Sequence, residues 1–212
     1  MKPKYIQVSC IEGDKIDLRQ SKAVIKHKPD LIFLEIPSNS LKPVTKTKSQ
    51  PKKVTDEFPW VKSDKYVWDN IIQLQKTGHN ILVYDIDGPH DLVSFEYKKN
   101  IYPYNKKYPY KTTNLFWWVR IYLRECFMAN KIKTILNNYK GKKEPVILIF
   151  LQSFHWRHVK FLLSNPTQKE IWDYYFKRFK KLSDKDISNL IKKENKTFFK
   201  YWTSPINLLN KS

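Results

Sequence analysis

The chain has 212 residues, of which 41% are hydrophobic and 15% aromatic, enough to build one sizeable hydrophobic core. No apolar run approaches the roughly 20 residues that cross a bilayer, so we expect no membrane span, and the first residues lack the apolar stretch of a secretory signal. Two cysteines, Cys10 and Cys126, are too few for a disulfide framework and favour a reducing, cytoplasmic setting.

The formal net charge is +20, and lysine rather than arginine supplies most of it. Glycine and alanine are scarce while Lys, Asn, Ile, Tyr and Phe abound, which is the residue usage of an AT-rich genome. A nucleic-acid site typically uses arginine for bidentate contacts. We therefore interpret the charge as compositional and spread over the surface, and keep RNA binding as an alternative.

Apolar runs and helical periodicities alternate along the chain. In chain order they predict strand Tyr5–Ser9, helix Asp17–His27, strand Leu31–Glu35, helix Asp64–Lys76, strand Ile81–Asp85, helix Thr112–Tyr139, strand Val146–Leu151, a short helix before Ser164, helix Gln168–Lys181 and a helix from Asp184 to Asn195. This order predicts a single α/β domain, residues 1–212, with a mostly parallel sheet and helices on both faces. Polar residues that follow the strands would then gather at the carboxyl edge of the sheet.

Two segments interrupt the alternation. Residues 38–59 are rich in Pro, Lys, Ser and Thr, and predict a long surface loop. Residues 97–114 interleave Tyr, Lys, Asn and Pro, which is typical of an irregular surface loop. A lid over a site, or a surface on which RNA bases stack between lysines, are the alternatives for this second segment.

The helix 112–139 is apolar on most sides and carries Arg120 and Arg124 one turn apart. A buried guanidinium needs an anionic partner, because an unpaired buried charge costs several kcal/mol. Glu125 points about 100° around the helix from Arg124, so Glu35, at the end of an apolar strand, is the better candidate. Such a pair either only holds the fold or forms part of a functional site.

His155 follows the apolar strand Val146–Leu151 and is expected at the carboxyl edge of the sheet. His158, three residues later, could share its face and complete a His-x-x-His pattern that is weakly indicative of a metal site. Glu35, Asp85, Asp87 or His90 would supply a third ligand. A divalent metal is thus an alternative that the sequence does not favour. For His155 we favour a functional role over a histidine that only caps the turn and packs.

Asp85 and Asp87 stand in ILVYDIDG, which resembles the first motif of haloacid-dehalogenase phosphatases. That resemblance implies a nucleophilic Asp85, an acid–base Asp87 and Mg²⁺. The likeness is short, lies 84 positions into the chain, and has Pro89 after Gly88. It supplies an alternative function, a phosphatase.

Three motifs together resemble the erythromycin-esterase/TraB/Tiki/ChaN superfamily. They are KPDLIFLEIP (28–37) with Glu35, RECFMANKIKTIL (124–136) with Arg124 and Met128, and VILIFLQSFHWRHVKFLL (146–163) with His155. The family's first Gly- and His-containing motif is absent, and its later Gly-x-x-His has lost the glycine. The resemblance therefore implies a Glu/Arg/His site and puts metal-dependent peptidase activity in doubt.

Two hypotheses follow for function. The first is a hydrolase for a small-molecule or peptide-like substrate, with Glu35, Arg124 and His155 as catalytic residues. Its substrate-binding residues would be Arg120, Asp85, Asp87, His90 and His158. The second is a non-catalytic protein that binds an anionic ligand, RNA or, by the resemblance, haem. The sequence assigns no cofactor.

Overall fold

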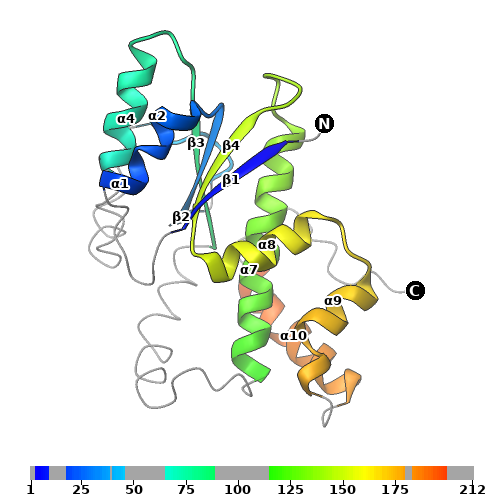
Figure 1. Cartoon of the computed structure of the whole chain (residues 1–212). Helices are drawn as coiled ribbons and strands as arrows, with labels where there is room; N and C mark the ends of the chain where they lie inside the picture. Colours follow the sequence, from blue (N-terminus) through cyan, green and yellow to red (C-terminus); the bar gives the residue numbers. More distant parts are fainter. Residues whose placement is uncertain are drawn as a thin grey trace.

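The computed structural model of the chain describes residues 3–9, 18–38, 40–45, 65–88, 115–179 and 183–199. Its centre is a four-stranded sheet in the order β1-β4-β2-β3, in which every neighbouring pair is parallel (Figure 1). The strands are β1 (Lys4–Ser9), β2 (Leu31–Pro37), β3 (Leu82–Asp87) and β4 (Val146–Leu151). The predicted α/β class with a parallel sheet is confirmed.

Helices cover both faces of this sheet, and two apolar clusters lie between the layers. On one face, side chains of β2, β3 and β4 pack against α2 (Ala23–His27) and α4 (Lys65–Gln75), next to α1 (Leu18–Ser21). On the other face they pack against α7 (Leu115–Asn137) and α8 (Ser153–Leu163). Burial on both faces explains why three of the strands are nearly continuous apolar runs.

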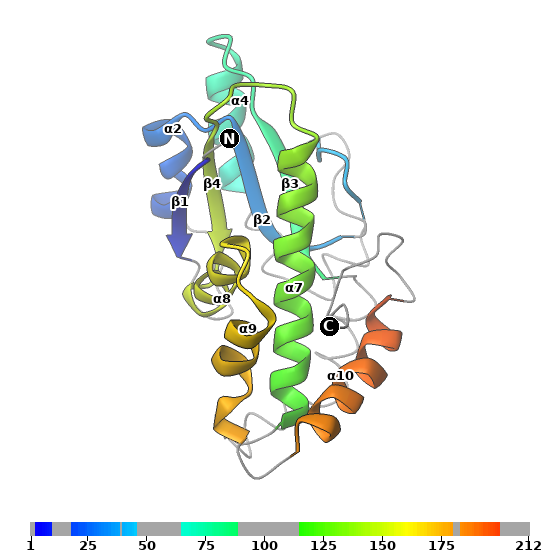
Figure 2. The same cartoon turned by 90° about the vertical axis from the view of Figure 1, so that its right-hand side faces the viewer.

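The helix α7 is the longest element and runs past the carboxyl ends of the strands. Its 23 residues span about 35 Å at 1.5 Å per residue. Beyond the sheet it lies beside α9 (Gln168–Tyr175) and α10 (Asp184–Phe199), as the views in Figures 1 and 2 show. Tyr122 of α7 packs edge-on against Tyr175 and Phe176 there. The middle of α7 is therefore level with the strand ends.

Local sequence explains most of the boundaries. Gly78 follows α4 and has φ +81°, a left-handed conformation that favours glycine just after a helix. Thr167 and Glu170 form a reciprocal capping box at the start of α9. Ser183 accepts a hydrogen bond from Asp186 N–H at the start of α10.

Several boundaries differ from the prediction. β2 continues two residues beyond Glu35, and β3 continues two beyond Asp85, so Asp87 belongs to a strand. The helix expected over residues 168–181 ends at Tyr175, and a 3₁₀ turn, Lys177–Phe179, follows it. Both strands extend because Pro37 pairs with Asp87 after a register shift between Leu34 and Pro37.

The two predicted loop insertions fall mainly outside the described residues. Of residues 38–59, the structure describes Ser38 and 40–45, where Val44 forms an isolated bridge with Val83. Residues 97–114, Cys10 and His90 lie outside the described part of the chain. Among the helices that are described, none has the length and apolar character needed to cross a bilayer.

Candidate functional site

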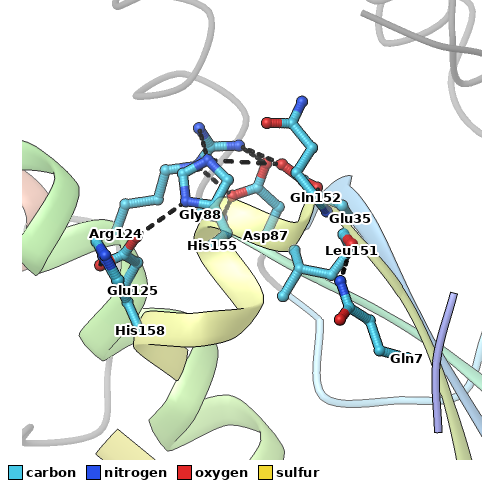
Figure 3. A network of polar contacts seen from close by, with 10 residues as sticks. All are labelled: Gln7, Glu35, Asp87, Gly88, Arg124, Glu125, Leu151, Gln152, His155 and His158. Atoms are coloured by element: carbon cyan, nitrogen blue, oxygen red, sulfur yellow. Dashed lines mark hydrogen bonds and ion pairs between the residues drawn. The ribbon is translucent and has the colours of Figure 1, made fainter. Parts of the chain in front are cut away.

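The carboxyl ends of β2, β3 and β4 bring polar side chains from separate parts of the chain together. The connection after β2 leads to α4 on one face, whereas the connection after β3 leads to α7 on the other. Ligands of open α/β sheets bind where neighbouring connections diverge in this way. Glu35 of β2 and Asp87 of β3 stand at this point, and α8 begins beside them (Figure 3).

Arg124 lies at the centre of the cluster. Its Nε and Nη2 donate to Oδ1 and Oδ2 of Asp87 at 2.7 and 2.6 Å, a bidentate pair. Its Nη2 also donates to Glu35 Oε1 at 3.2 Å. Asp87 accepts a further hydrogen bond from the backbone N–H of Gly88. One guanidinium thus joins the ends of two neighbouring strands.

Glu35 is held at both carboxylate oxygens. Oε2 accepts from the backbone N–H of Gln152 at 2.9 Å, directly before α8. Oε1 faces Arg124 and lies 3.8 Å from His155 Nε2. Burial raises the pKa of this carboxyl to about 7. The charge of Arg124 lowers the pKa, but the charge of the nearby Asp87 offsets part of that effect. Glu35 can therefore gain or lose a proton near neutral pH.

His155 is buried and contacts charged groups at both ring nitrogens. Nδ1 lies 3.0 Å from Glu125 Oε1, and Nε2 lies 3.4 Å from Arg124 Nη1. Burial and the neighbouring guanidinium lower the pKa of His155, although Glu125 acts in the opposite direction. The imidazole is therefore neutral at neutral pH, with one ring nitrogen that carries a lone pair.

Glu125 is fully buried and receives hydrogen bonds from two further groups. Its Oε2 lies 2.8 Å from His158 Nδ1 and accepts from the Tyr175 hydroxyl at 2.9 Å. Burial raises the pKa of Glu125 to about 7, and the hydrogen bonds from His155 and Tyr175 limit that rise. Burial lowers the pKa of His158 to about 4, with Arg157 and Arg178 adding to the effect.

Lys131 is a second buried cation, seven residues after Arg124 on α7. Its Nζ donates to the backbone oxygen of Ser38 at 2.7 Å and lies over the ring of Phe127. Burial lowers its pKa to about 8, although the charges of Asp85 and Asp87 oppose the change. Lys131 thus ties the chain that follows β2 to the long helix.

The structure brings Glu35, Arg124 and His155 into direct contact, and adds Asp87 to them. Of the other predicted residues, His158 joins through Glu125, and Asp85 is buried within β3. Arg120 is half-buried one turn before Arg124. Among the side chains that the structure describes, no three of His, Cys, Asp and Glu are grouped so as to hold a metal ion.

Sequence reasoning missed the parts played by Glu125, Tyr175 and Lys131. The signal was available for the two charged residues, because both stand on a helix already predicted to be buried and each needs partners of its own. A buried Glu125 needs hydrogen-bonding partners, and the two histidines of the His-x-x-His pattern in α8 contact its carboxylate. Tyr175 carried no comparable signal.

Models of known protein families, curated proteins and solved structures all give no match to this chain. The chemistry of the site must therefore be argued from its own groups. A carboxyl with a pKa of about 7, a neutral imidazole and a guanidinium lie within contact distance of one another. Such a group can move a proton and stabilise negative charge at one place.

Proposed function

We propose that this protein is a hydrolase in which Glu35 is the general base, Arg124 stabilises developing negative charge and His155 assists. One observation carries the proposal. A single oxygen of Glu35, Oε1, lies 3.2 Å from Arg124 Nη2 and 3.8 Å from His155 Nε2. The oxygen that accepts the proton, the guanidinium group and the imidazole nitrogen therefore lie next to one another.

Proton affinity and exposure both support Glu35 as the base. A pKa of about 7 suits a group that takes and returns a proton near neutral pH. The side chains of Glu35 and Arg124 are 13% and 18% exposed, against 2% for Asp87 and 5% for His155. Substrate and water would thus reach the base and the cation before the groups behind them.

The proposed reaction is the hydrolysis of an acyl bond in a small-molecule or peptide-like substrate. Glu35 Oε1 takes a proton from water while the water oxygen attacks the carbonyl carbon, and the one lone pair of His155 Nε2 accepts a hydrogen bond from the same water in place of Arg124 Nη1. Arg124 stabilises the oxyanion. Glu35 then returns its proton to the leaving group as the acyl bond breaks. The resemblance to the erythromycin-esterase superfamily supports an ester as substrate, and the scarcity of cysteine supports a cytoplasmic setting.

The alternative functions have less support. A phosphatase would need Asp87 to exchange a proton with the substrate, yet Arg124 donates hydrogen bonds to both of its carboxylate oxygens. Binding of an anionic ligand at Arg124 would leave the raised pKa of Glu35 without a role. The residues that suggested RNA, 97–114, lie outside the described part of the chain, and nothing at the described strand ends points to haem.

The test is hydrolysis of p-nitrophenyl acetate and p-nitrophenyl butyrate by the full chain at neutral pH. We expect Glu35→Gln to lower kcat/KM by about 10²- to 10⁴-fold, the usual contribution of general base catalysis. Glu144→Gln removes an exposed carboxylate just before β4 and is the matched control, expected to retain full activity. Absence of turnover by the wild-type chain, or equal rates for the two variants, would refute the proposal.

A further inference from the structure

The carboxylate of Glu125 is the meeting point of three helices. It stands on α7 with an exposed fraction of 0%, and it contacts two side chains of α8 and one of α9. In the reaction above, Glu125 touches neither substrate nor water. Burying an acidic group this deeply costs free energy that its hydrogen bonds only partly offset. This cost indicates that the buried carboxylate has a role of its own.

We propose that Glu125 is a positioning residue that holds His155 as the Nδ1–H tautomer, so that the lone pair of Nε2 points toward Glu35 and Arg124. This inference rests on the proposed hydrolase function for its catalytic meaning. The tautomer itself is a property of the resting protein and can be measured without a substrate.

The contact at Nε2 of His155 indicates which ring nitrogen carries the proton. A guanidinium carries only donors, so Arg124 Nη1, 3.4 Å away, can contact this nitrogen favourably only when the nitrogen accepts. A neutral imidazole has one donor and one acceptor nitrogen, and the donor must therefore be Nδ1. Nδ1 lies 3.0 Å from Glu125 Oε1, an acceptor at the right place (Figure 3).

At the other oxygen of Glu125, Oε2 accepts from the Tyr175 hydroxyl at 2.9 Å and lies 2.8 Å from Nδ1 of His158. Burial raises the pKa of Tyr175 and lowers that of His158 to about 4, so Tyr175 remains a donor and His158 remains neutral. Burial also raises the pKa of Glu125 to about 7, so the carboxyl is ionised above that pH. An ionised Glu125 can only accept, which fixes the proton on Nδ1 of His155.

Replacing the carboxylate by an amide would break this arrangement. A glutamine side chain has one acceptor, its oxygen, and its NH2 group is a donor. His155, His158 and Tyr175 would present three donors to these two groups. Where the NH2 group meets His155, Nδ1 must accept and the proton moves to Nε2, which then faces Arg124. In the Ser-His-Asp triad the equivalent carboxylate-to-amide change lowers kcat by about 10⁴ through the wrong tautomer.

The experiment is ¹⁵N NMR of the full chain with labelled histidine, without substrate, at about pH 8.5, where the Glu125 carboxyl is ionised. The His155 signals are identified by their loss in His155→Asn. We expect the wild-type protein to show the protonated-type shift at Nδ1 and the unprotonated type at Nε2. In Glu125→Gln we expect the opposite assignment. Tyr175→Phe is the matched control, because it removes a hydrogen bond to Oε2 only, and its His155 tautomer should stay as in the wild type.

A wild-type His155 protonated at Nε2, or a Glu125→Gln chain that keeps Nδ1–H, would overturn the inference. The wild-type spectrum decides the tautomer even where the variant does not fold. A parallel assay with p-nitrophenyl acetate separates the two proposals. If the wild-type chain shows the Nδ1–H tautomer but no turnover, the tautomer inference holds and the hydrolase function fails. If the tautomer changes in Glu125→Gln while kcat does not fall by at least about 10²-fold, Glu125 sets the tautomer but His155 has no part in hydrolysis, which overturns the positioning role. If the tautomer changes and kcat falls while KM stays unchanged, Glu125 acts on the reaction through His155.

Discussion

Arg124 holds Asp87 through two parallel hydrogen bonds, Nε to Oδ1 at 2.7 Å and Nη2 to Oδ2 at 2.6 Å. The pair joins the middle of α7 to the end of β3, and only 2% of the Asp87 side chain is exposed. Geometry of this kind holds a guanidinium in one orientation, which a single hydrogen bond does not. The orientation of the proposed oxyanion-stabilising cation thus depends on Asp87.

Asp87→Asn should destabilise the protein, because the amide replaces one acceptor with a donor that faces the guanidinium. Breaking a buried pair by removing one charge costs about 3 kcal/mol or more, and urea denaturation should show this as a lower free energy of unfolding. Lys142→Met is the control, since Lys142 pairs with Asp30 at 2.8 Å but is 66% exposed. It should cost less than about 1 kcal/mol. Equal losses in the two variants would contradict the assignment.

Glu35→Gln should change how stability depends on pH. The folded state holds the Glu35 proton with a pKa of about 7, above the 4.5 of an ordinary glutamate. Between these values the folded state binds more protons than the unfolded state, so this group's contribution to stability falls as pH rises. The wild-type minus Glu35→Gln difference in unfolding free energy should therefore decrease from about pH 4.5 to about pH 7. Urea titrations across that range test it, and a constant difference speaks against the raised pKa.

Lys131→Met should change the pH dependence of stability in the alkaline range, in the direction opposite to Glu35→Gln. Burial lowers the pKa of Lys131 from 10.5 to about 8, so between these values the unfolded state binds more protons. This group's contribution to stability then increases with pH. The wild-type minus Lys131→Met difference in unfolding free energy should rise from about pH 8 to about pH 10.5. A difference that falls or stays level would show that Lys131 is not buried as a cation.

Gly78→Ala should destabilise the end of α4 by about 1 kcal/mol. The glycine has φ +81°, and the left-handed conformation costs an L-residue with a Cβ roughly 1–2 kcal/mol. No atom lies within 4 Å of the position the Cβ would take, so the loss comes from the backbone alone. The substitution Gly78→Asn should lose less, because asparagine tolerates this region better than alanine. Thermal unfolding of the two variants gives the order.

The parallel sheet and the Glu35–Arg124 contact were both predictable, for separate reasons. Continuous apolar runs such as Val146–Leu151 indicate strands covered on both faces. The contact followed from the cost of a buried guanidinium on an apolar helix. That reasoning named a carboxylate at a strand end as the partner, and the structure has Glu35 there together with Asp87.

The dominance of Asp87 could not be predicted. It depends on β3 continuing two residues beyond Asp85 and on where α7 crosses the strand ends. Neither the extension of β3 nor the position of α7 can be inferred from the local sequence ILVYDIDG. Glu125 was correctly expected to point away from Arg124, but the position of α8 on that side of α7 is a matter of tertiary packing. Its role therefore became visible only when the two helices were seen together.

The strand order has a consequence for how the chain folds. β1 and β2 are not neighbours, since β4 lies between them and pairs with both. β4 is the partner of β1 in the described sheet, so β1 cannot join the sheet until residues 146–151 are in place. Those residues are separated from β1 by more than a hundred positions, and contacts of such long range slow folding. During synthesis on the ribosome, β2 can pair with β3 before β4 is made, whereas the place of β1 and the Glu35–Gln152 contact both depend on the later part of the chain.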